Sequence, residues 1–144
     1  MRDLSQGQVA EIKMETIIKQ QGEIFRHSFE EMGRIMELNG HYYIRFEEST
    51  EDGKASVTIK IAREGYVQLI RNGEVTTRLV FNREHPQEFT YATPAGRLGM
   101  LVRTDHLDIV LNDQPFSGEL AVDYSILSSD SQIGDYYLRL QFTT

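Results

Sequence analysis

A chain of 144 residues with a formal net charge of −7 and no cysteine excludes several classes of protein at the outset. No disulfide framework, thiolate nucleophile or cysteine-ligated zinc can form, and the acidic balance offers no basic footprint for nucleic acid. No stretch approaches the roughly 20 apolar residues of a membrane-spanning helix, and the first residues lack the apolar run of a signal peptide. We therefore expect one cytoplasmic domain over residues 1–144, with 1–8 as a flexible N-terminal segment and with no nucleic acid and no membrane as partners.

Apolar side chains recur at every second position from about residue 9 onward, which is the pattern of β-strands buried on one face. The clearest case is 54–62, where Ala55, Val57, Ile59 and Ile61 alternate with polar residues. Strands are predicted at 9–20, 24–37, 41–48, 54–62, 66–71, 74–81, 87–93, 97–103, 106–111, 117–127 and 135–143. With one of these eleven ranges taken as spurious, the chain has about ten strands, the last two of which should pair.

Turn residues predict the register of three hairpins. Gln21-Gly22, Asn39-Gly40 and Asn72-Gly73 each suit a two-residue turn, because Asn and Gly tolerate the positive φ that such turns need. The first turn would place Thr16 opposite His27, and the third would place Gln68 opposite Thr77. Between residues 97 and 111, Thr104-Asp105 is read as a further connection.

Consecutive antiparallel strands of this number leave hazardous edges unless the sheet closes. We therefore expect an all-β fold in which an antiparallel up-and-down meander of about ten strands closes into a barrel.

Several segments also resemble the YwiB-like family of small bacterial proteins, which are calycin-like, lipocalin-related β-barrels of unknown function. The resemblance spans nearly the whole chain and rests on the order of six blocks: Ile12–Thr16, Tyr42–Glu48, Thr58–Ile61, Leu69–Val75, Phe89–Gly96 and Gly118–Tyr124. The resemblance implies an architecture but no activity, because fold alone does not assign function.

Motifs for catalysis are not found. The chain has no glycine spacing typical of a nucleophile elbow, a phosphate loop or a dinucleotide site. His106 and Asp108 share a strand face, but two ligands do not make a metal site. The pair Glu47-Glu48 is attributed to a charged outer surface, since neighbours on a strand point to opposite faces. We expect no enzyme, no catalytic residues, no cofactor and no metal.

The third hairpin suggests which polar groups line the interior. Its Ile70 face carries the larger share of apolar side chains and is taken as the inner one. The candidate ligand-binding residues of the barrel lumen are His27, Tyr42, Tyr66, Gln68, Thr77 and Tyr91.

Two readings of function stay open. Apolar walls with a few polar groups are typical of a pocket for a small hydrophobic or amphipathic ligand, although tyrosines can also belong to a packed core. The alternative is a protein-interaction module or homodimer that uses Val67, Leu69 and Val80 beside Arg78 on the outer face. A further, minor possibility is an anion site at Arg34 and Arg45, which the Asn39-Gly40 turn places side by side.

Overall fold

The computed structural model describes residues 7–50, 53–128 and 131–144, and all of its regular structure is β-strand. The strands are β1 (Gln8–Gln20), β2 (Glu23–Leu38), β3 (His41–Thr50), β4 (Gly53–Ile61), β5 (Val67–Asn72), β6 (Thr76–Phe81), β7 (Gln87–Thr93), β8 (Gly96–Asn112), β9 (Ser117–Ser128) and β10 (Ser131–Thr143). Of the predicted flexible segment, residues 1–6 lie outside the described residues, and Gln8 already belongs to β1. The described part of the chain contains no helix that could cross a membrane.

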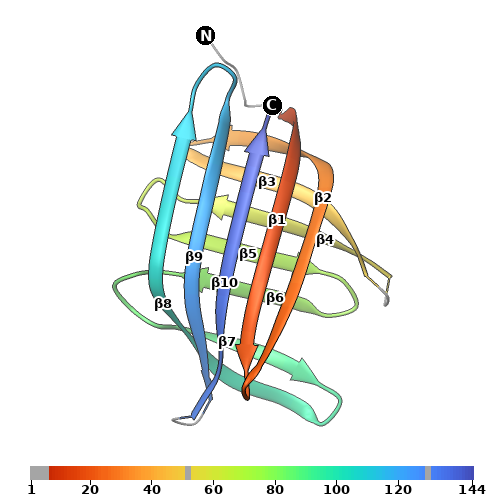
Figure 1. Ribbon diagram of the computed structural model, residues 1–144, viewed down its shortest axis with the longest axis vertical. Coiled ribbons are helices and arrows are strands. Elements are labelled where there is room, and N and C mark those ends of the chain that lie inside the picture. Colours follow the sequence, from red (N-terminus) through yellow and green to blue (C-terminus); the bar gives the residue numbers. More distant parts are fainter. Residues whose placement is uncertain (1–6, 51–52, 129–130) are drawn as a thin grey trace.

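The ten strands form one antiparallel sheet in the order β6-β5-β4-β3-β2-β1-β10-β9-β8-β7. The sheet coils into a nearly closed barrel, in which β3 to β6 cross behind β8, β9, β10, β1 and β2 at a steep angle (Figure 1). The first and last strands pair with each other, as do β9 and β10, whereas β6 and β7 are the two ends of the order. The predicted all-β barrel of about ten strands is therefore confirmed.

One predicted connection is wrong. The ranges 97–103 and 106–111 belong to a single strand, β8, because Thr104-Asp105 forms an irregularity in the pairing with β9 and not a turn. A β-bulge of this kind adds a residue to one strand and bends it without reversing the chain. The bend lets β8 pair with β7 in its first half and with β9 in its second.

The first two hairpin registers are confirmed. Gln21 and Gly22 have φ values of 52° and 78°, and Asn39 and Gly40 have 53° and 84°, as a two-residue turn with left-handed central residues requires. Consequently Thr16 lies opposite His27.

The predicted register of the third hairpin is wrong, and the error assigned the side chains of β5 to the wrong faces of the sheet. Asn72 pairs with Thr76, so the loop is three residues long and Gln68 lies opposite Val80 instead of Thr77. An odd change in loop length moves every β5 side chain to the other face of the sheet. Val67 and Leu69, predicted on the outer face, are in fact buried in the core, at 0% and 5% exposure.

The inner face of the barrel is packed at one end and exposed at the other. Along β10, Phe142, Leu140 and Leu138 are buried while Tyr136 is half-buried. β1 and β9 show the same gradient toward the end that carries the β1–β2 turn, at the bottom of Figure 1. Apolar burial at the packed end stabilises the fold by roughly 1.5–3 kcal/mol per large side chain. We call the other end the exposed end of the inner face.

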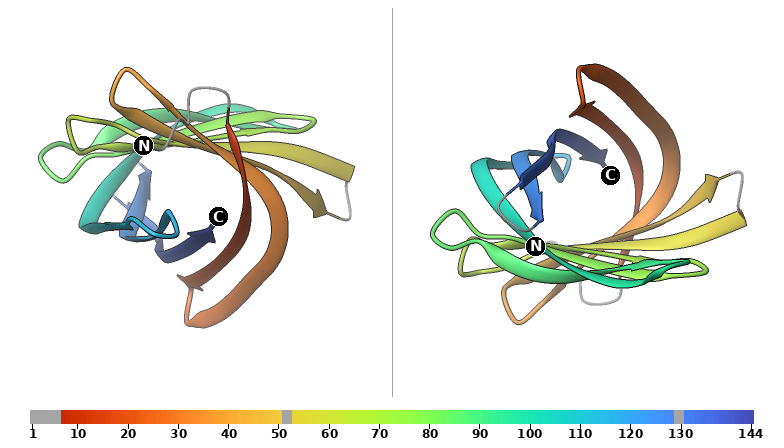
Figure 2. Two further views of the ribbon diagram at one scale, coloured as in Figure 1. Left: turned by 90° about the horizontal axis from the view of Figure 1, so that it is seen from above. Right: turned by 90° about the horizontal axis from the view of Figure 1, so that it is seen from below.

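The wall of the barrel parts between β2 and β3. Their pairing ends at Arg34 and Arg45, after which β2 pairs only with β1. Gly33 sits at the parting point, where a Cβ atom would lie 2.3 Å from the carbonyl oxygen of Arg45 and 2.5 Å from Ile12 Cδ1. Figure 2 shows β2 curving away from the β3–β4 hairpin beyond this point. Side chains, not backbone hydrogen bonds, therefore connect β2 and β3 near the exposed end.

Candidate functional site

A buried carboxylate lies where β2 and β3 part. Glu48 follows Ile44 and Phe46 on the inner face of β3 and is only 4% exposed. An unpaired buried charge is expensive in a protein interior and requires partners. The assignment of Glu48 to the outer surface is thus wrong, whereas its neighbour Glu47 is exposed as expected.

Two basic side chains hold this carboxylate from different strands. Arg71 Nη2 of β5 lies 2.9 Å from Glu48 Oε2. His27 Nε2 of β2 lies 3.1 Å from Glu48 Oε1 and bridges the parting of the wall. The register places no other basic side chain on the inner face of the described strands. We refer to Glu48, Arg71 and His27 as the Glu48 cluster.

The hydrogen bonding around the cluster is incomplete. Glu48 Oε2 contacts Arg71 by charge, but it accepts no well-aligned hydrogen bond, and the buried Nε of Arg71 donates to no acceptor in the described residues. The same is true of the buried hydroxyl of Thr104, which lies opposite Tyr124 on the inner face. Buried polar groups without partners each cost about 1–3 kcal/mol, and such groups often mark functional sites.

Aromatic side chains surround the cluster. Phe29 and Phe46 face each other across the parting, with ring centroids 5.2 Å apart. On the opposite wall, Tyr124 and Tyr136 stack at 5.0 Å with an interplanar angle of 9°. Burial raises the pKa of Tyr124 far above its usual value, and the nearby charge of Arg71 opposes that rise only in part. Tyr124 therefore stays a neutral phenol close to Arg71.

Three of the six predicted lumen residues lie on the inner face toward the exposed end. His27 belongs to the Glu48 cluster, and Thr77 lies opposite Arg71 on the inner face. Burial raises the pKa of Tyr136, and its neighbour Tyr91 raises that pKa further. Tyr91 is itself about half exposed.

The other three lie elsewhere. Tyr42 is on the inner face but packs at the opposite end, with its ring 5.6 Å from that of Phe116. Tyr66 accepts a hydrogen bond from Lys60 Nζ on the outer face, at 3.2 Å, and Gln68 shares that face. The placement of Tyr66 and Gln68 in the lumen is therefore wrong, for the same reason of register as before.

Sequence reasoning missed Glu48 and Arg71. The alternation of Ile44, Phe46 and Glu48 was a usable signal for the first. Arg71 had no such signal, because its face depends on the length of the β5–β6 loop. Because Val67 and Leu69 are buried, the outer face does not carry the apolar patch that was predicted from them.

Other predicted pairs meet but assemble no larger site. Arg34 and Arg45 are cross-strand neighbours as predicted, and both line a groove of about 890 Å³ over β2, β3 and β4. His106 Nε2 contacts Asp108 Oδ2 at the surface. Within the described residues, no three His, Asp or Glu side chains gather as metal ligands.

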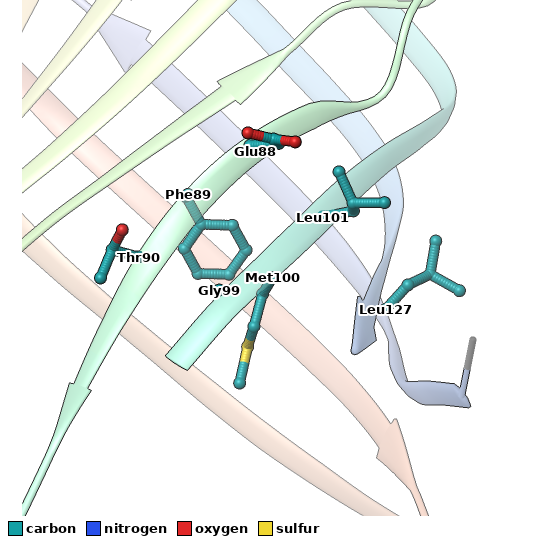
Figure 3. A pocket seen from close by; sticks show the side chains of 7 residues that line it. All are labelled: Glu88, Phe89, Thr90, Gly99, Met100, Leu101 and Leu127. Atoms are coloured by element: carbon teal, nitrogen blue, oxygen red, sulfur yellow. The ribbon is translucent and has the colours of Figure 1, made fainter. Parts of the chain in front are cut away.

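A separate pocket of about 840 Å³ lies along the β7–β8 hairpin (Figure 3). Phe89, Met100, Leu101 and Leu127 supply its apolar lining, with Glu88 as its charged group. The pocket includes none of the predicted lumen residues, and it contains no member of the Glu48 cluster.

Fold and site together define a nearly closed ten-stranded antiparallel barrel with a buried ion-paired carboxylate near its exposed end. The chain belongs to the family described as "Domain of unknown function (DUF1934)", whose model matches residues 12–140. The crystal structure of the ywiB protein from Bacillus subtilis has a similar fold, with a TM-score of 0.82 and 17% sequence identity over 96% of this chain and 93% of that one. The resemblance to a YwiB-like family is thus confirmed. A search of curated proteins found no match.

Proposed function

We propose that the barrel binds a small, partly apolar molecule at the exposed end of its inner face. The observation that carries this proposal is the Glu48 cluster, which places buried and incompletely bonded polar atoms in a mostly apolar interior. A mostly apolar lining with a few placed polar groups is the general character of small-molecule sites. Ligand atoms that reached these groups would offset the cost of burying them.

Accessibility supports the same end of the barrel. The side chains of His27 and Arg71 are 57% and 40% exposed although both contact the buried Glu48. Phe25 and Leu98, which the register also places on the inner face, are each about half exposed. A ligand could therefore contact apolar and charged groups together without entering the packed end.

The role proposed is binding and not catalysis. In the described residues, the Glu48 carboxylate contacts Arg71 and His27 but no second carboxylate or hydroxyl nucleophile. Acid–base chemistry usually needs two groups poised on one substrate bond. The cluster is better suited to hold a polar group of a ligand in place.

Native mass spectrometry of the full chain purified from bacterial cells tests the proposal directly. A small molecule that travels with the monomer, and is released on denaturation, is the expected result. Tyr136→Ala should reduce its occupancy, while the outer-face control Tyr66→Ala should not. A bare monomer or a bare dimer, together with no thermal shift from a panel of amphipathic compounds, would contradict the proposal.

A further inference from the structure

The Glu48 cluster also indicates the charge of the ligand. We propose that the site recognises the carboxylate head of an amphipathic molecule through Arg71 and His27, with Glu48 as the residue that positions them. This inference rests on the proposed binding function and adds the class of ligand.

The first argument is the division of exposure within the cluster. Glu48 is almost fully buried, whereas both of its basic partners are substantially exposed. A ligand that approaches from solvent therefore meets the two basic groups before it meets the carboxylate. A buried group that fixes exposed ones is the arrangement expected of a support for a binding site.

The second argument concerns the atoms that remain free. The Nε atom of Arg71 is buried, so the nitrogen surface that Arg71 offers belongs to its Nη groups. One of these contacts Glu48, and the guanidinium plane presents further N–H donors in a fork that matches a carboxylate. An anion on the exposed part of Arg71 would lie nearer to the guanidinium than to Glu48, so attraction exceeds repulsion.

His27 is the second basic side chain of the cluster. Its Nε2 atom is engaged with Glu48, and its Nδ1 atom has no partner in the described residues. An imidazolium donates from both ring nitrogens. Among the described residues, Glu48 is the one acidic group that faces the two basic side chains, so the cluster holds one basic group in excess.

The surroundings suit a molecule with an apolar tail. Phe29 and Phe46 lie beside His27 and Glu48, and the stacked Tyr124 and Tyr136 lie on the wall beyond Arg71. Aromatic side chains offer large apolar contact areas. A cationic head group is disfavoured, because the exposed guanidinium of Arg71 would repel it before it reached Glu48.

Three probes with one tail separate the possibilities: decanoate, decanol and decylamine, each titrated into the full chain by isothermal calorimetry. We expect decanoate to bind at least about tenfold more tightly than decanol, since a charge-assisted hydrogen bond is worth about that ratio or more. Equal binding of decanoate and decanol would overturn the carboxylate inference and leave the proposed function standing. Tighter binding of decylamine would overturn the inference in favour of a cation, and no binding by any probe would count against both proposals.

Variants then assign the contact. Arg71→Lys keeps a positive charge beside Glu48 but loses the fork, and should weaken decanoate by about tenfold while leaving decanol unchanged. Arg78→Lys, on the exposed outer face of β6, is the matched control and should bind decanoate like the wild type. His27→Gln should weaken decanoate alone. If Arg71→Lys and Arg78→Lys have equal affinity for decanoate, Arg71 does not recognise the head group.

Discussion

Removal of Arg71 tests most directly whether Glu48 is a buried, compensated charge. Two unit charges 2.9 Å apart attract by about 6 kcal/mol at an effective dielectric constant of 20. Because Arg71 is 40% exposed and His27 still contacts the carboxylate, the net cost of Arg71→Met should be smaller, about 2–3 kcal/mol. For a chain of this size, that cost lowers the Tm by about 10 °C.

Companion variants at Glu48 complete a double-mutant cycle with Arg71→Met. Glu48→Gln should cost less, about 1–2 kcal/mol, because Arg71 is left partly in contact with solvent. The double variant should then be more stable than the sum of the two single losses by about 1–2 kcal/mol. Arg78→Met, at an exposed position of the outer face, should change stability by less than about 0.5 kcal/mol.

Urea unfolding followed by far-ultraviolet circular dichroism measures all four variants. Losses that add within about 0.5 kcal/mol would refute the interpretation of Glu48 as a buried charge held by Arg71.

Three further predictions test the fold around the site. Gly33→Ala should destabilise the barrel by about 2 kcal/mol or more, since its methyl group would overlap the carbonyl of the adjoining strand. Gly99→Ala has open space and should be nearly neutral. Equal shifts of the Tm for the two variants would contradict the close approach of β2 to β3 at Gly33. Leu69→Ala should lower the free energy of unfolding by about 2–5 kcal/mol, and Gln68→Ala should lower it by less than about 0.5 kcal/mol. If urea unfolding gave the reverse order, the two-residue turn would be the correct register. Tyr124 has a raised pKa when folded, so its contribution to stability is complete below about pH 10 and is lost as the pH rises further, by up to about 1.4 kcal/mol per pH unit. In Tyr124→Phe, stability should fall less steeply above about pH 10. If stability fell equally with pH in the variant and the wild type, Tyr124 would not be the source of the alkaline loss.

The sequence alone determined the architecture, because alternation and turn chemistry are local properties. The period of two in 54–62 specified a strand buried on one face, and the positive φ of Asn39-Gly40 followed from the residues themselves. These signals correctly predicted the antiparallel barrel and the place of His27 opposite Thr16. The family resemblance came separately, from the order of six sequence blocks.

The candidate site needed the tertiary structure, because it depends on relations between strands that are distant in sequence. Asn72-Gly73 is compatible with either a two- or a three-residue loop, and the choice between them decides which face Arg71 occupies. The favourable burial of Val67 and Leu69 selects the longer loop. Only then do Arg71 and Glu48 meet, and only the parting of β2 from β3 at Gly33 lets His27 reach the same carboxylate.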